Sequence, residues 1–124
     1  GAFAFAIYDH VAGSLLLARD RYGKRPLFYA QHAGALVFAS EMKAFLAFRD
    51  FQLAADPQQL SSIFAQWTPL PAQSGFKGIR QLPMACFLRV QEGQRSEGST
   101  SGSTLLAGRR SPAKRKPWRW SGRR

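Results

Sequence analysis

Hydrophobic and small residues alternate along the first eight positions of the chain. Phe3, Phe5 and Ile7 are separated by alanines, and this period of two is typical of a β-strand. Because both faces of the segment are apolar, we predict a central strand buried between two layers. A polar turn over residues 9–13 leads into the leucines at 15–17, so the two segments are predicted to form a hairpin.

Later segments predict further strands and two helices. Short apolar runs predict strands over 26–30 and 36–38 and a last strand over 86–90. Asp56 followed by Pro57 is typical of a helix start, with the aspartate as N-cap and the proline at the first helical position. The apolar residues that follow recur at helical spacing, at Leu60, Ile63, Phe64 and Trp67.

A shorter helix is expected after residue 40. Ser40 can act as its N-cap, and Glu41 falls in the first turn, where the helix dipole favours an anion. Hairpins followed by helices favour an α+β fold with antiparallel sheets over a doubly wound parallel sheet.

Charge divides the chain into two parts. Residues 1–97 carry 10 Lys and Arg against 7 Asp and Glu, whereas residues 98–124 carry 8 basic residues and no acidic one, which together give the net charge of +11. Apolar periodicity ends before residue 96. We therefore predict a globular part over 1–95 and a low-complexity basic tail over 96–124 that is disordered.

The cysteine and histidine content excludes several kinds of site. Cys86 is the only cysteine, so an internal disulfide and a four-cysteine metal site are excluded. His10 and His32 fall in predicted turns, where we interpret them as solvated side chains, and we expect no metal site.

No apolar run reaches the length of about 18 residues that spans a bilayer, and no signal peptide is seen at the N-terminus. We expect a cytoplasmic protein that does not bind a membrane.

Four segments in order carry a resemblance to a known family. They are GAFAFAIYD (1–9), LLLARDRYGKRPLFYA (15–30), LVFASEMKAFLA (36–47) and the stretch 56–83. Together they resemble the late part of the class II glutamine amidotransferase domain, the glutaminase half of glutamine-hydrolysing asparagine synthetases. The resemblance implies an Ntn-hydrolase αββα sandwich, of which this chain would be a fragment.

The resemblance also implies a reaction and its partners. In the family an N-terminal cysteine attacks glutamine, and the ammonia passes to a synthetase domain that uses ATP and Mg²⁺ to amidate aspartate. In the family that cysteine is the first residue of the mature protein, whereas residue 1 here is a glycine, and the segments that grip glutamine would lie upstream of Gly1. We therefore expect a piece of a longer protein that is inactive alone. We assign it no catalytic, glutamine-binding or ATP-binding residue and no cofactor of its own. Packing on a synthetase domain and a homodimer are expected of the parent protein.

The family motifs contain a few polar residues that could have structural or interface roles. Arg19, Asp20, Gly23 and Pro26 either shape the surface that faces the synthetase domain or form a structural loop, with an Arg–Asp pair and a positive φ at Gly23. We favour the structural interpretation. We likewise interpret Ser40 and Glu41 as a helix cap, and Cys86 as a buried small thiol and not a nucleophile.

Other interpretations stay open for the tail and the acceptor. A shift of reading frame near residue 97 would explain the basic composition, and the chain would otherwise be a small nucleic-acid-binding protein that uses residues 98–124, with Trp118 and Trp120 stacking on bases. We favour the frame shift and do not expect nucleic acid as a partner. Amidotransferases of surface-polysaccharide clusters share the same motifs, so an acceptor other than aspartate is a further alternative.

Overall fold

The described chain forms two compact units. The computed structural model describes residues 1–67 and 70–100. One unit contains residues 1–25 and the described residues from Met84 on, and the other contains Pro26–Pro83. Both are built on antiparallel sheets with few helices, which confirms the predicted α+β class and is consistent with part of an Ntn-hydrolase domain.

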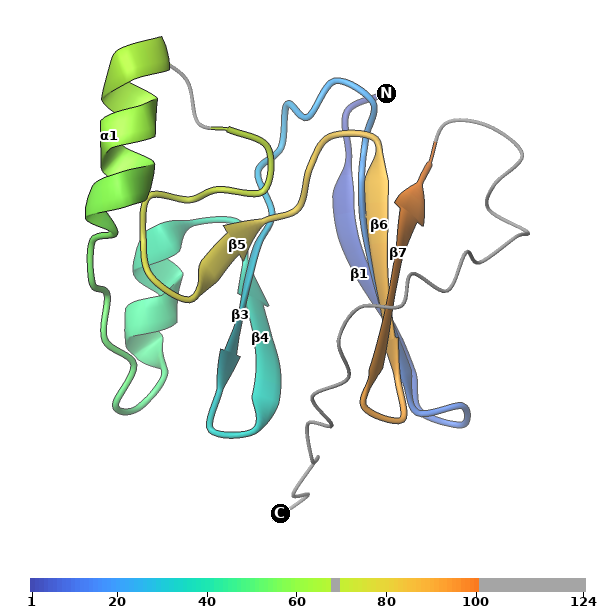
Figure 1. Ribbon diagram of the computed structural model, residues 1–124. Helices are drawn as coiled ribbons and strands as arrows, with labels where there is room; N and C mark the ends of the chain where they lie inside the picture. Colours follow the sequence, from blue (N-terminus) through green and yellow to red (C-terminus); the bar gives the residue numbers. More distant parts are fainter. Residues whose placement is uncertain (68–69, 101–124) are drawn as a thin grey trace. The chain divides into compact units, whose positions relative to one another are not determined.

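The first unit contains a four-stranded sheet in the order β1-β2-β6-β7 (Figure 1). Its strands are β1 (Ala4–Asp9), β2 (Ser14–Arg19), β6 (Cys86–Gln91) and β7 (Gln94–Ser99). The predicted hairpin is confirmed, because β1 and β2 pair antiparallel with Asp9 opposite Ser14. Leu17 and Leu88 lie opposite each other in neighbouring strands and are both fully buried.

The burial of the first strand differs from the prediction. β1 lies at an edge of the sheet and not at its centre, and five of its six residues are exposed. The apolar alternation correctly predicts an extended strand, because it indicates that both faces of the segment can be buried. It does not indicate which strands lie on either side, and within the described chain only β2 pairs with β1.

The end of the sheet also corrects the prediction. A turn at Glu92 and Gly93, with φ of 51° and 74°, leads the chain back as β7, so the strand predicted over 86–90 is not the last. The boundary expected at residue 95 falls inside β7. The sequence of β7, QRSEGS, lacks apolar alternation and therefore did not indicate a strand. An edge strand can form through backbone pairing alone while its side chains stay in water.

The second unit contains a three-stranded sheet in the order β4-β3-β5. Its strands are β3 (Phe28–His32), β4 (Ala35–Ala39) and the short β5 (Ile79–Gln81), which the sequence did not indicate. Figure 1 shows β5 beside β3, with which it pairs antiparallel although the two strands are far apart in the sequence. The buried core of this unit contains one side chain from each surrounding element: Ala30, Val37, Phe45 and Ile79.

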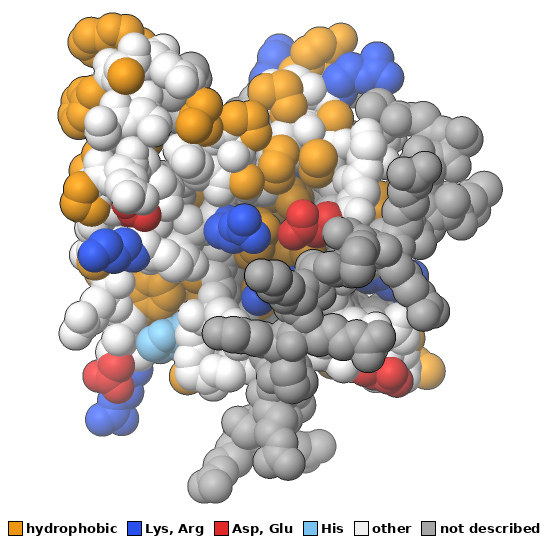
Figure 2. Space-filling model, in the orientation of Figure 1, with side chains coloured by type: hydrophobic (Ala, Val, Ile, Leu, Met, Phe, Trp, Pro, Cys, Tyr) orange, Lys and Arg blue, Asp and Glu red, His pale blue; other side chains and the backbone are white. Residues whose placement is uncertain are grey.

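The helix predicted at Asp56 is confirmed. Helix α1 (Pro57–Gln66) begins at a proline, and the Asp56 carboxylate accepts hydrogen bonds from the backbone N–H groups of Gln58 (3.0 Å) and Gln59 (3.3 Å). Its apolar face is only partly covered. Figure 2 shows hydrophobic atoms, in orange, over the position of α1, and Phe64 and Trp67 are 67% and 89% exposed.

The short helix predicted after Ser40 is present, but it is a 3₁₀ helix and its cap differs from the prediction. It is the 3₁₀ helix η1 (Met42–Ala47), and Glu41, not Ser40, occupies its N-cap position without a side-chain capping bond. The exposed Glu41 carboxylate instead lies 3.0 Å from the Lys43 ammonium. A six-residue 3₁₀ helix satisfies its amides through bonds three residues apart, so the cap has less to stabilise than in an α-helix.

Candidate functional site

The motif residues Arg19, Asp20 and Gly23 come together at the end of β2 and in the loop that follows it. Asp20 is the most buried charged side chain described, at 1% exposure. Its two carboxylate oxygens accept three backbone hydrogen bonds, from Phe3 at 2.8 Å and from Tyr22 and Gly23 at 2.7 Å each. The carboxylate therefore ties the start of β1 to the turn after β2.

The environment of Asp20 favours its charged form. Burial by itself would raise the pKa of the carboxyl group, but the hydrogen bonds from Phe3, Tyr22 and Gly23 and the nearby charge of Arg19 lower it. The net effect is a pKa below the ordinary value. Such a carboxylate remains ionised and is already occupied by backbone donors, so its arrangement suits loop fixation better than proton transfer.

The Arg19 side chain also binds backbone groups of this loop. Its Nε donates to the carbonyl of Arg25 at 2.8 Å, and its Nη2 donates to the carbonyl of Gly23 at 2.6 Å. Burial lowers the pKa of its guanidinium, while the charge of Asp20 raises it. The two side chains thus hold different backbone groups of one loop.

Gly23 occupies the position where this loop is tightest. Its φ is +61°, as predicted, and a Cβ built there would lie 3.0 Å from the Met84 Cβ and 3.1 Å from the Arg19 Nη2. Both the backbone conformation and the space require glycine. Pro26, the remaining motif residue of this stretch, is half-buried and opens the second unit.

The Cys86 thiol and the His32 ring lie in different strands, β6 and β3. Burial and the charge of Glu97 raise the pKa of the Cys86 thiol, which disfavours the nucleophilic thiolate. His32 was expected in a turn but ends β3, where its Nε2 donates to the Arg49 carbonyl at 2.7 Å and its ring lies 5.1 Å from that of Phe51. Among the described residues, no cluster of three or more His, Cys, Asp or Glu could hold a metal ion.

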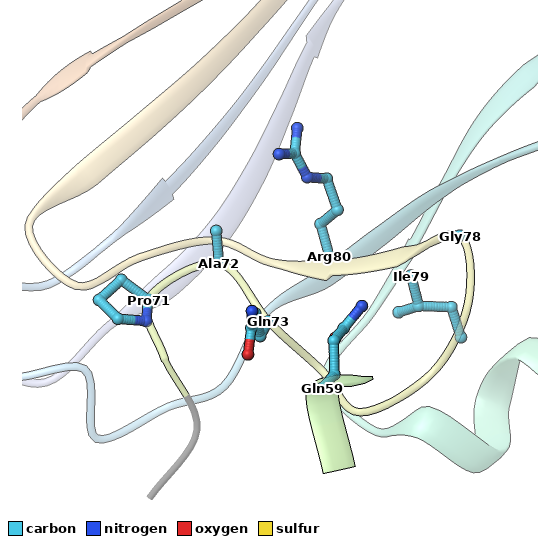
Figure 3. A pocket seen from close by; sticks show the side chains of 7 residues that line it. All are labelled: Gln59, Pro71, Ala72, Gln73, Gly78, Ile79 and Arg80. Carbon is cyan, nitrogen blue, oxygen red and sulfur yellow. The ribbon is translucent and has the colours of Figure 1, made fainter. Parts of the chain in front are cut away.

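A hollow of about 440 Å³ in the second unit was not indicated by any sequence motif (Figure 3). It is lined by Gln59 of α1 and by residues of the 71–80 stretch, among them Gln73 and Arg80. The Oε1 of Gln73 is buried and accepts no hydrogen bond from the described residues. The Gln59 amide, in contrast, accepts from the Ser74 and Gly75 N–H groups, so it serves to anchor the loop to the helix.

The basic stretch considered for nucleic-acid binding lies almost entirely outside the described residues, and so does the proposed frame shift product beyond residue 100. Within residues 1–67 and 70–100, no helix is long and apolar enough to cross a membrane.

Comparisons with known proteins agree with the motifs. A family profile described as "Glutamine amidotransferase domain" matches residues 1–100. "Asparagine synthetase [glutamine-hydrolyzing] 3" of Bacillus subtilis is 40% identical over 83 residues, which are 66% of this chain and 14% of that protein. A "Putative asparagine synthetase [glutamine-hydrolyzing]" of Mycobacterium bovis is 37% identical over 98 residues, 76% of this chain and 15% of its own length.

A relative with a different name matches a similar length. "Amidase chry2" of Gibberella zeae is 32% identical over 98 residues, which are 78% of this chain and 14% of that protein. The chain thus spans about one seventh of the length of the curated relatives it matches.

Proposed function

This chain belongs to the glutamine amidotransferase domain family. We propose that residues 1–100 form part of the structural scaffold of the glutaminase domain in a glutamine-dependent asparagine synthetase. The match of the family profile over residues 1–100 carries this proposal. In the parent protein, glutamine supplies ammonia, and a synthetase domain with ATP and Mg²⁺ transfers it to aspartate. The described residues contribute strands and the fixed Arg19–Asp20 loop, and none of them takes part in a chemical step.

The residue chemistry supports a scaffold role. The one thiol in the sequence, Cys86, has a raised pKa, and Asp20 is occupied by three backbone donors. A nucleophile of this kind needs a lowered pKa or an adjacent base. We therefore propose that the 124-residue polypeptide alone does not hydrolyse glutamine.

A chimaera tests the scaffold role. The 83 aligned residues of this chain would replace their counterparts in the B. subtilis relative, and asparagine formation would be measured with glutamine and, separately, with ammonium as nitrogen source. We expect both activities to remain, because the segment supplies structure and not reacting groups. A folded chimaera that keeps the ammonium-dependent activity but loses the glutamine-dependent one would refute the proposal.

The inactivity of the chain alone has its own test. Purified 124-residue chain would be incubated with glutamine, with a Cys86→Ser variant as the matched control. We expect no ammonia release above the control. Release that depends on Cys86 would show that this thiol is a nucleophile, contrary to the raised pKa.

A different acceptor is the second candidate, and one observation favours it. The relative named "Amidase chry2" matches about as much of this chain as the asparagine synthetases do, so the segment occurs in proteins that carry other names. An amidotransferase with an acceptor other than aspartate, such as one from a surface-polysaccharide cluster, would share residues 1–100. Assaying the full-length parent with aspartate and glutamine distinguishes the two, because only an asparagine synthetase forms asparagine.

A further inference from the structure

The two ends of the four-stranded sheet have different connections. At one end the strands are joined in pairs by short turns, over residues 10–13 and at Glu92 and Gly93. At the opposite end β1 starts, β2 ends, β6 starts and β7 ends, because neighbouring strands are antiparallel. All connections between this sheet and the rest of the chain therefore pass through that second end, which we call the junction end.

Asp20 lies at the junction end and is bonded to the segments that meet there. Its carboxylate accepts from the Phe3 N–H at 2.8 Å, and its own N–H donates to the Phe3 carbonyl at 3.0 Å. Its carbonyl accepts from the N–H of Ala85, just before β6, at 2.8 Å. The Ala85 carbonyl accepts in turn from the N–H of Thr100, just after β7, at 2.7 Å. All four strand ends are thus tied together through Asp20 and Ala85.

The chain accepts unfavourable features to build this junction. Ala85 has a φ of +56°, in the left-handed region that residues other than glycine rarely adopt. Asp20 is a charged group at 1% exposure, and burying a charge is costly unless hydrogen bonds satisfy it. Backbone strain of this kind persists where the surrounding structure fixes it, and it is concentrated at functional sites. The junction therefore points to a need for accurate placement of the strand ends.

We propose that Asp20 is a positioning residue for glutamine hydrolysis in the parent protein, and that it acts through the start of β1. This inference rests on the proposed function, in which the segments expected to hold glutamine precede β1 in the chain. Those segments enter the sheet at Phe3, and both backbone polar groups of Phe3 are bonded to Asp20. Asp20 fixes the place of that entry and itself touches neither glutamine nor the nucleophile.

The two carboxylate oxygens make Asp20→Asn a specific test. Oδ2 accepts from Phe3, whereas Oδ1 accepts from Tyr22 and Gly23. An asparagine of the same size keeps one acceptor oxygen and replaces the other with an NH₂ donor. It can therefore bond the loop or the start of β1, but not both. The side-chain link between the two segments is broken without creating a cavity.

The experiment uses the full-length parent protein. Glutamate release is measured against glutamine concentration, and product formation from ammonium is measured separately. Asp9→Asn is the chemical control, because Asp9 Oδ1 accepts from the Val11 and Ala12 N–H groups at the turn end of the same strand. Val90→Ala is the stability control, because it truncates a buried side chain of the same sheet and leaves the bonds of Asp20 in place.

We expect Asp20→Asn to raise the KM for glutamine by on the order of 10-fold, because small misplacements of groups that hold a substrate are costly. Its ammonium-dependent activity should equal that of the wild type. Asp9→Asn and Val90→Ala should keep the wild-type KM. A merely structural role would reduce the amount of folded enzyme, which lowers the apparent kcat and leaves the KM unchanged.

The outcomes separate this inference from the proposed function. A wild-type KM for glutamine in Asp20→Asn would overturn the positioning role, and so would an equal rise of KM in either control. A wild-type parent that releases no glutamate from glutamine would refute the glutaminase assignment itself, and this inference with it.

Discussion

The Phe45 side chain offers the sharpest test of the second unit's core. It is fully buried, packs with Ala30, Val37 and Ile79, and its ring centroid lies 5.2 Å from that of Phe51. Truncating a buried phenylalanine to alanine typically costs about 3–5 kcal/mol, because transfer energy is lost and a cavity remains. We expect Phe45→Ala to fall in this range.

The assay is amide hydrogen exchange in β3 and β4, which reports the free energy of opening of this sheet. A loss of about 3–5 kcal/mol lowers protection by roughly 100- to 5,000-fold. Phe45→Leu, which we expect to cost about 1–2 kcal/mol, keeps the effect measurable should the alanine variant open completely. Phe48→Ala is the matched control, because the Phe48 ring lies in the same segment but is 37% exposed.

The order of the losses in amide protection among these variants tests whether Phe45 is the centre of the core. The structure requires Phe45→Ala to reduce protection far more than Phe48→Ala, with Phe45→Leu between them. Equal effects at 45 and 48 would show that Phe45 is not the centre of this core.

Two further predictions concern the first unit. Because the pKa of Asp20 is lowered by folding, its contribution to stability is present above the unfolded pKa of about 3.9 and is lost as pH falls through the lower folded value. Asp20→Asn should therefore lower the melting temperature at pH 6 and flatten its fall below pH 4, and a variant with the wild-type acid dependence would contradict this. Gly98→Ala should destabilise β7 by about 1–3 kcal/mol, because the new Cβ would lie 2.6 Å from two ring carbons of Phe87. Exchange at β7 amides measures the loss, and an equal loss in Ser96→Ala would rule out this clash as its cause.

Local features of the fold could be predicted from sequence because their causes are local. The Asp56–Pro57 helix start depends on side-chain and backbone chemistry within three residues, and the β1–β2 hairpin depends on alternation around one turn. The positive φ at Gly23 belongs to the same class. The family motifs likewise lie in continuous segments, and the profile match over residues 1–100 agrees with them.

The sequence did not determine which backbone groups would meet across long separations. Asp20 looked like half of an ion pair with its neighbour Arg19, but its carboxylate binds the N–H of Phe3, 17 residues away. β5 and β7 were missed because backbone pairing with β3 and β6 forms them, and their side chains carry little apolar periodicity.

By itself, the sequence determined the family, the antiparallel α+β class and the local starts and turns, since these depend on short-range chemistry. Only the tertiary structure decided that β1 lies at an edge, that Asp20 is a buried anchor and that Phe45 centres a core. The physical reason is that burial and strand neighbours are properties of residues far apart in the chain, and alternation specifies a strand's faces without specifying its partners.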